Sequence, residues 1–312
     1  MNYILGAGVA GIAAAYYLDD FSVIDPKPLG QLNTPFIPGP RLIQHNKYTE
    51  KFVKSLFGDN YEIKEAKIGF EHLGTVSENA NSIFREKYSL MTRDKDSSES
   101  SYLSEGKTRI KHIVICEYGE DSYSELMKRA LSIVKDRGQL ISSKIFDIDH
   151  SKNIIYTGDG VIKYEKIINS LSLKILKKMP IISVLLKNVL LENTTKCFYQ
   201  CSYGSEIDRN ITDLYDYIYS VSGLYSRRTH FSEYIVYESK EPIEITNNKI
   251  EGNVVMRSIE NLPIQIKNSL CLENIEDIIL LGRYAEWNHK VKLDQVLTKV
   301  NSISEKLYSN GR

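Results

Sequence analysis

The stretch Asn2-Tyr3-Ile4-Leu5-Gly6-Ala7-Gly8-Val9-Ala10-Gly11 decides the fold of this chain of 312 residues. Residues 2–5 form an apolar run typical of a buried strand, and glycines with the spacing G-x-G-x-x-G follow at once. A helical pattern covers residues 9–18, and a second apolar strand over residues 21–24 ends at Asp25. Strand, glycine turn, helix and strand in this order predict a Rossmann-type βαβ unit, which binds a dinucleotide at the glycine turn.

Each glycine of the motif has a physical role. Gly6 allows the tight turn, Gly8 lets the backbone approach a pyrophosphate, and Gly11 lets the helix pack close to the strand. The pyrophosphate is expected at the positive end of the helix, beside its free N–H groups. Asp25 ends the second strand, where a carboxylate accepts hydrogen bonds from the adenosine ribose and repels a 2′-phosphate. FAD and NAD share this motif, so the rest of the chain must distinguish them.

The chain leaves regular β-α alternation after Asp25. A loop rich in proline and glycine covers residues 29–40, and helical spacing returns at residues 48–56 and 122–138. Short strands are predicted over residues 141–148, 153–157, 161–164 and 166–170, with a hairpin turn at residues 157–160. Residues 71–111 are polar and predicted to be irregular. Residues 181–257 alternate as strands, and a strand at 278–283 and a helix at 293–307 close the chain.

This order of elements predicts an α/β fold with two interleaved domains. A discontinuous Rossmann-type domain would comprise residues 1–45, 112–172 and 272–312, and a β-rich substrate domain residues 46–111 and 173–271. Many of the 21 tyrosines fall within residues 199–237. Because tyrosine combines an apolar ring with a polar tip, we expect most of them on a half-hydrated sheet surface, with a wall over the cofactor as the alternative.

Composition and charge exclude several classes of function. Lys plus Arg and Asp plus Glu both number 40, so the charge balance argues against a nucleic-acid partner. No secretory signal precedes the first strand, and the apolar run of residues 181–191 is short and broken by Lys187. We therefore expect a cytoplasmic protein without a membrane span. Cys197 and Cys201 lack a second cysteine pair or a nearby histidine, which favours structural thiols over a metal site.

Several segments together resemble the flavin amine oxidase superfamily, especially its UDP-galactopyranose mutase-like and protoporphyrinogen oxidase-like members. The first is the glycine motif with Asp25. Residues 29–32, Leu-Gly-Gln-Leu, resemble the glycine-doublet loop beside the flavin, with one glycine remaining. Residues 225–229, Tyr-Ser-Arg-Arg-Thr, resemble a substrate-domain segment. Residues 282–287, Gly-Arg-Tyr-Ala-Glu-Trp, with the later Asp-Gln-Val at 294–296, resemble the segment that completes the flavin site.

The resemblance implies non-covalently bound FAD, held by residues at both ends of the chain. Gly6, Gly8, Ala10 and Gly11 would hold the diphosphate, and Asp25 the adenosine ribose. Gln31 and Leu32 would lie near the flavin, and the backbone of Ile145 would contact the adenine. The site would be closed by residues near the C-terminus: Gly282, Arg283, Asp294, Gln295 and Val296.

The resemblance leaves three functions open. The first is a FAD-dependent oxidoreductase in which a small-molecule substrate transfers a hydride to flavin N5. The second is a flavin-dependent mutase acting on a nucleotide-sugar, and the third a non-catalytic flavoprotein. Arg41 replaces the histidine of the mutases' Gly-Pro-His segment, and the insertion after residue 46 is short for their substrate domain; both features argue against a mutase. The sequence is compatible with a homo-oligomer.

No residue of the chain has to act as a nucleophile, and three side chains are weak candidates for catalysis. Arg41 could bind an anionic substrate or stabilise reduced flavin, or merely pair with a surface carboxylate. Arg228 could bind a substrate anion, and His230 could act as an acid or base. Trp287 either stacks near the cofactor or fills the core.

Overall fold

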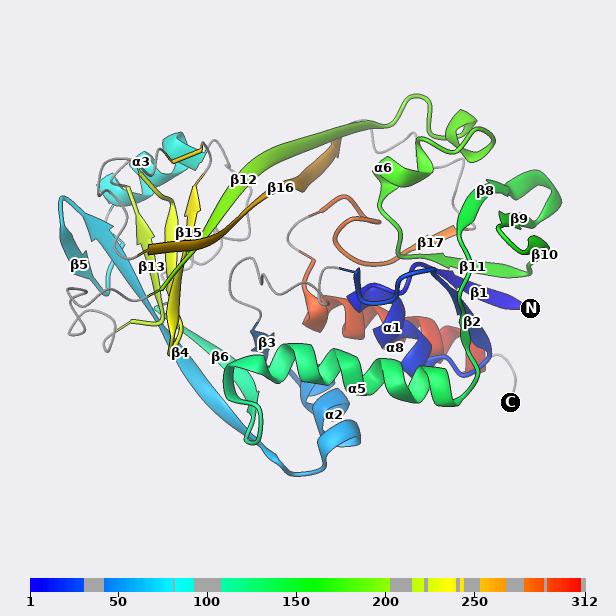
Figure 1. The fold of residues 1–312 in the computed structure, drawn as a ribbon, viewed down its shortest axis with the longest axis horizontal. Helices are drawn as coiled ribbons and strands as arrows, with labels where there is room; N and C mark the ends of the chain where they lie inside the picture. Colours follow the sequence, from blue (N-terminus) through cyan, green and yellow to red (C-terminus); the bar gives the residue numbers. More distant parts are fainter. Residues whose placement is uncertain are drawn as a thin grey trace.

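The computed structural model describes residues 1–30, 42–80, 82–92, 108–202, 215–221, 224–239, 242–243, 253–267, 278–288 and 291–309. Within these residues the chain forms a mixed α/β fold (Figure 1). One part is built on a five-stranded parallel sheet. The other is built on a large mixed sheet, and the long strands β12 (Leu190–Ser202) and β16 (Asn253–Lys267) extend from it towards the first part.

The parallel sheet has the strand order β17-β11-β1-β2-β7, and every neighbouring pair runs parallel. Its strands are β1 (Asn2–Leu5), β2 (Phe21–Ile24), β7 (Leu140–Ile141), β11 (Lys166–Asn169) and β17 (Ile278–Leu280). Thus strands from the N-terminus, the middle and the C-terminus of the chain lie side by side. The strands at residues 2–5 and 21–24 match the bounds predicted from the sequence.

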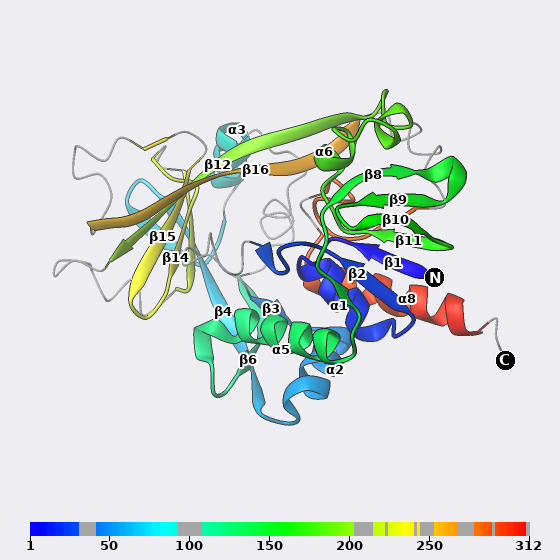
Figure 2. The same cartoon turned by 45° about the vertical axis from the view of Figure 1, so that its right-hand side comes forward.

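Both faces of the parallel sheet are covered, which explains its nearly continuous apolar strands. On one face Ile4 and Val23 pack with the helices α1 (Val9–Tyr17), α2 (Lys47–Phe57), α5 (Ser122–Asp136) and α8 (Leu293–Ser309). On the other face Tyr3 and Leu5 pack with a small antiparallel sheet and α6 (Leu173–Leu176). Figure 2 shows the small sheet on one side of β1 and the helices on the other.

The small sheet has the order β10-β9-β8 and follows α5 and β7 in the chain. Its strands are β8 (Ile145–Asp149), β9 (Ile154–Thr157) and β10 (Gly160–Lys163). Thr157 pairs with Gly160 across the β9–β10 hairpin, as the glycine-rich turn predicted. Three short 3₁₀ helices complete this part of the chain: Gly119–Asp121, His150–Lys152 and Ile182–Val184.

The large sheet has the order β16-β12-β15-β14-β13-β4-β6-β3, with β5 paired to β4. Its remaining strands are β3 (Ile43–Gln44), β4 (Tyr61–His72), β5 (Thr75–Ser77), β6 (Arg109–Ile115), β13 (Tyr217–Ser220), β14 (Arg227–His230) and β15 (Tyr234–Ser239). The β-rich character predicted for residues 181–257 is confirmed within the described residues.

The expectation that residues 71–111 are irregular is wrong in part. This segment contains β5, the start of β6 and the helix α3 (Ser82–Thr92). Phe84 and Tyr88 lie one turn apart on α3 with stacked rings 5.9 Å apart, and they pack against Phe70 and Tyr219 of the large sheet. Two aromatic residues in a polar sequence are therefore enough to hold this helix on the sheet.

The expected half-hydrated tyrosine surface is also corrected by the structure. The side chains of five tyrosines on or beside the large sheet are only 1–8% exposed: Tyr199, Tyr217, Tyr219, Tyr225 and Tyr237. Tyr217 and Tyr219 are covered by α3, while Tyr225 and Tyr237 pack edge to face on each other. These tyrosines are core residues of the second part of the chain.

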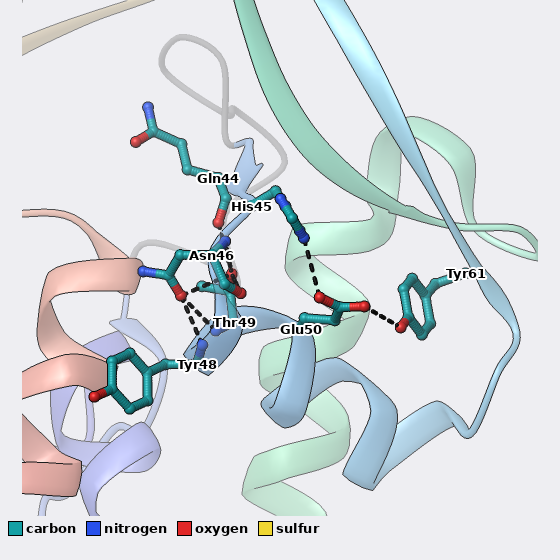
Figure 3. A network of polar contacts seen from close by, with 7 residues as sticks. All are labelled: Gln44, His45, Asn46, Tyr48, Thr49, Glu50 and Tyr61. Atoms are coloured by element: carbon teal, nitrogen blue, oxygen red, sulfur yellow. Dashed lines mark hydrogen bonds and ion pairs between the residues drawn. The ribbon is translucent and has the colours of Figure 1, made fainter.

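Helix α2 begins in a network of polar contacts shown in Figure 3. Asn46 accepts hydrogen bonds from the backbone N–H groups of Tyr48 and Thr49, and the Thr49 hydroxyl accepts one from the Asn46 N–H. The next residue, Glu50, accepts a hydrogen bond from the Tyr61 hydroxyl at 2.8 Å and lies 3.0 Å from His45 Nε2. This network joins the start of α2 to β4 and to the segment after β3.

Substitution of Glu50 by glutamine is expected to make stability less sensitive to acid. The hydrogen bonds from Tyr61 and then His45 lower the pKa of Glu50 below its usual value of 4.5. A carboxyl group with a lowered folded pKa adds stability above its unfolded pKa and loses it as pH falls through the folded pKa. Urea unfolding at a series of pH values between about 5 and about 3 should therefore show a shallower decline for Glu50→Gln. Identical declines in the two proteins would contradict this assignment.

Candidate functional site

The glycine turn between β1 and α1 is held from several sides. Gly6 has a φ of +91°, which favours glycine, and its N–H donates to the Ile24 carbonyl at 3.0 Å. The Ser170 hydroxyl at the end of β11 donates to the carbonyl of Gly6 at 2.8 Å. A Cβ atom added at Gly11 would lie 1.9 Å from the Gly6 carbonyl oxygen, so α1 crosses this turn in direct contact.

Gly8 differs from the other glycines of the motif because it faces open space. It is exposed, and an added Cβ would have no atom within 4 Å. Gly8 is also the N-cap of α1, and no side chain forms a capping hydrogen bond there. The positive end of α1 is therefore accessible to an anion, as the motif predicted.

Asp25 lies directly beside the glycine turn. Its Oδ2 accepts a hydrogen bond from the Ala7 N–H at 2.7 Å, and its Oδ1 accepts one from the Lys27 N–H at 2.7 Å. The Asp25 N–H donates to the carbonyl of Ile141, at the end of β7, and the predicted adenine contact Ile145 begins β8 four residues later. The carboxylate thus orients the turn, and a ribose contact remains a prediction for its other lone pairs.

The segment after β17 packs against helix α1, next to the glycine turn. Gly282 has a φ of +97°, and an added Cβ would lie 2.6 Å from the Cβ of Ala10 on α1. The Gly282 N–H donates to Glu286 at 2.9 Å, and Glu286 forms an ion pair of 3.2 Å with Lys299 of α8. Arg283 is held by a hydrogen bond of 3.4 Å to the Val291 carbonyl. The structure therefore brings predicted site residues from both ends of the chain into contact.

The first turn of α8 carries the remaining predicted residues. The Gln295 side chain accepts a hydrogen bond from the Lys292 N–H at 2.9 Å, and Val296 is buried in the core. Within the described part of the chain, the buried Oδ1 atom of Asp294 has no hydrogen-bond partner. A buried acceptor without a donor costs free energy, so its presence suits a site that a ligand hydroxyl would complete.

The catalytic candidates do not lie at the glycine turn. Arg228 and His230 belong to β14 of the large sheet, a strand that lies apart from α1 in Figure 2. Arg228 is 7% exposed and lies 5.9 Å from the ring centre of Tyr225. His230 Nδ1 lies 2.8 Å from the Tyr215 carbonyl, and burial lowers the pKa of His230 to about 4, so the ring is neutral at pH 7. Predictions for Gln31, Leu32 and Arg41 fall outside the described residues.

For Trp287 the structure decides between the two predicted alternatives, and for Ser170 it shows a role that the sequence did not predict. Trp287 is 2% exposed, packs in the core and donates to the Glu192 carbonyl at 2.7 Å, so it is a core residue rather than a stacking platform. Ser170 was not singled out, although it binds the carbonyls of both Leu5 and Gly6. Its position directly after a buried strand was the available signal.

Metal binding and membrane spanning find no support in the described residues. No group of three or more His, Cys, Asp or Glu side chains there is arranged to hold a metal ion. Cys197 and Cys201 are buried among apolar and tyrosine side chains, and burial raises the pKa of Cys201 to about 12. None of the described helices has the length and apolar character needed to cross a membrane.

Comparison with known proteins shows which solved structures share this fold. No protein-family model and no curated protein sequence matches the chain. A reduced UDP-galactopyranose mutase matches with a TM-score of 0.66 and 11% identity, covering 99% of this chain and 95% of the mutase. A redesigned putrescine oxidase gives 0.62 and 8%, covering 98% of each chain. Cyclohexylamine oxidase from Brevibacterium oxydans IH-35A gives 0.61 and 11%, covering 98% of this chain and 99% of the oxidase. The fold thus resembles that of the FAD amine oxidase-like enzymes, as the sequence motifs predicted.

Proposed function

We propose that this chain is a FAD-dependent oxidoreductase acting on a small molecule. The observation that carries the proposal is the open glycine turn at Gly8, with the C-terminal segment at Gly282 packed on the same helix. We further propose that the parallel sheet belongs to a Rossmann-type FAD domain of residues 1–45, 112–172 and 272–312. Most of the large sheet would then belong to the substrate domain of residues 46–111 and 173–271, while β3 and the end of β6 fall within the first domain. Matches of fold to flavoenzymes over almost the whole chain support this division.

Residues from the N-terminal and the C-terminal segments of the chain together form a site that fits FAD. The backbone at Gly8 and the N-terminus of α1 would bind the diphosphate, since the space there is open and the helix end is positive. Asp25 would accept from the ribose, and the unpartnered Oδ1 of Asp294 would accept from a hydroxyl of the cofactor. Bound FAD would supply the hydride acceptor at N5. The protein's part is to hold the cofactor and to orient the substrate against it.

Removal of the Asp294 side chain is expected to separate cofactor affinity from stability. Asp294→Ala deletes a buried acceptor that has no partner in the described structure, so the free energy of unfolding without FAD should fall little or rise slightly. The same change should weaken FAD binding by about tenfold, the loss of one good hydrogen bond. Asp294→Asn keeps an oxygen acceptor and should bind FAD better than the alanine variant. Unchanged FAD affinity in Asp294→Ala would remove this residue from the proposed site.

The reaction type can be tested with flavin absorbance under anaerobic conditions. Bleaching of the flavin band by an amine, or by another small oxidisable substrate from a panel, supports the oxidoreductase. An oxidoreductase of this kind needs no prior chemical reduction. Turnover of a UDP-sugar only after reduction with dithionite supports a mutase instead. FAD binding without turnover on either panel supports the non-catalytic flavoprotein.

A flavin-dependent mutase is the second candidate, and one observation favours it. The match with UDP-galactopyranose mutase has a TM-score of 0.66, against 0.62 and 0.61 for the two oxidases, although the short insertion after residue 46 argues against a mutase. Arg228 on β14 would be the described residue that binds an anionic substrate, with Arg41, outside the described residues, as the second arginine. Arg227 binds Glu238, with its Nε 2.7 Å from the carboxylate.

A further inference from the structure

A cavity of about 560 Å³ opens between helix α5 and the segment that follows β2. Its wall combines three lysines, two leucines and a hydroxyl group: Lys27, Lys128, Lys135, Leu29, Leu131 and Ser132. Sites for small molecules commonly measure about 300–1,000 Å³ and combine apolar walls with a few polar groups. The cavity therefore has the size and composition of a small-ligand site.

The lysines reach this cavity from both of its walls. Lys27 belongs to the segment after β2, and Lys128 and Lys135 lie about two turns apart on α5. Among the described residues, those that line the cavity include no acidic side chain. Glu125 pairs with Lys128 at 2.6 Å from outside the lining. The described lining of the cavity thus carries three positive charges and no negative charge.

The remaining wall indicates which anion fits. Lysine binds phosphate as a point charge, and three lysines suit the nearly double negative charge of a phosphate monoester better than the single charge of a carboxylate. Ser132 adds a neutral hydroxyl donor. Leu29 and Leu131 are 3% and 8% exposed, so they form a fixed apolar wall. Together these groups match a phosphate monoester that carries an apolar ring or chain.

The cavity is lined in part by the segment that follows Asp25 and contacts the glycine turn. Leu29 has a φ of 64°, a left-handed conformation unusual for leucine, and its N–H donates to the Ala7 carbonyl at 2.7 Å. Leu29 also lines the cavity. Leu29 therefore contacts the glycine turn through its backbone N–H and also lines the cavity.

We propose that this cavity is a second ligand site, distinct from the glycine turn, which binds a small phosphorylated molecule with an apolar part. The site goes beyond the proposed FAD chemistry, because its lysines and Ser132 belong to none of the predicted cofactor contacts. Leu29 and Gly30 of its lining begin the segment that resembles the loop beside the flavin. The chemical class of the ligand is inferred from the three lysines, which come from two elements and lie beside a buried apolar wall.

Titration calorimetry of the full chain with phenyl phosphate tests this site. We expect saturable binding at one site per chain, and weaker binding of inorganic phosphate because it lacks the ring. Lys27→Gln combined with Lys135→Gln should weaken phenyl phosphate binding by about tenfold or more, with thermal unfolding unchanged. Lys51→Gln, which removes an exposed lysine of α2, is the matched control and should bind as the unaltered chain does.

Two results would overturn the proposal. One is the absence of saturable binding, or equal weakening by Lys51→Gln, either of which would mean general attraction to positive surface charge. The other is competition between FAD and phenyl phosphate, which would place the cavity within the dinucleotide site. Equal affinity for phenyl phosphate with and without added FAD supports two sites. Failure of the chain to bind FAD would leave the first titration intact, so the two proposals fail separately.

Discussion

Gly11→Ala is expected to destabilise the folded chain by about 2–3 kcal/mol, the cost of forcing an atom into a packed interior. The new Cβ would lie 1.9 Å from the Gly6 carbonyl oxygen and 2.7 Å from Ser170 Oγ. Neither contact is with a flexible side-chain end that could move aside at low cost, since Ser170 Oγ is itself bonded to the Gly6 carbonyl. Helix α1 must therefore shift away from β1. Urea unfolding followed by circular dichroism measures the change in the free energy of unfolding.

Gly8→Ala is the matched control for this prediction. Gly8 has a φ of −72°, which alanine adopts without strain, and nothing lies within 4 Å of an added Cβ. Its free energy of unfolding should fall by no more than about 1 kcal/mol, because alanine is a poorer N-cap residue than glycine and the new Cβ meets no other atom. Equal stability of the two variants would show that α1 does not cross the glycine turn as closely as the structure places it.

Glu238→Ala is expected to destabilise the second part of the chain by about 3–5 kcal/mol. Glu238 on β15 is 1% exposed and binds Arg227 through both Nε and Nη2, and Lys196 of β12 lies 3.5 Å from its other oxygen. These two cations have side-chain exposures of 16% and 14%. Loss of the carboxylate would leave both positive charges poorly compensated between neighbouring strands. The free energy of unfolding in urea measures the loss.

A double variant distinguishes charge pairing from simple packing at this position. If Glu238 acts by compensating Arg227, Arg227→Ala combined with Glu238→Ala should cost less than the sum of the single changes. Glu238→Gln should fall between Glu238→Ala and the unaltered chain, because it keeps the shape and one acceptor oxygen. Additive losses, or a loss below about 1 kcal/mol for Glu238→Ala, would contradict the ion-pair account.

The parts of the fold that were predicted correctly are those in which local sequence and packing agree. The strand at residues 2–5, the helix from Val9 and the strand at residues 21–24 follow from apolar runs punctuated by glycine. The last helix follows from its apolar face. The parallel neighbours β11 and β17 are far away in sequence, so only the family resemblance indicated that Gly282 would meet Ala10.

The errors arose where tertiary contacts override local pattern. Helix α3 carries a polar sequence and is held by Phe84 and Tyr88, whose partners lie on a distant sheet. Alternating tyrosines predict a half-hydrated sheet surface, because nothing in the sequence shows that a helix covers Tyr217 and Tyr219. The role of Ser170 likewise depends on carbonyl groups about 165 positions away in the chain. Such contacts leave no periodic signal.

The most direct test of the central claim is the dissociation constant for FAD, measured by calorimetry on the unaltered chain and on Gly8→Ala. The unaltered chain is expected to bind one FAD and to show the yellow flavin absorbance. Gly8→Ala should unfold at a similar urea concentration but bind FAD at least about tenfold more weakly, because its Cβ occupies the space at the end of α1. An unaltered chain that binds no FAD, or equal affinity in the two proteins, would contradict it.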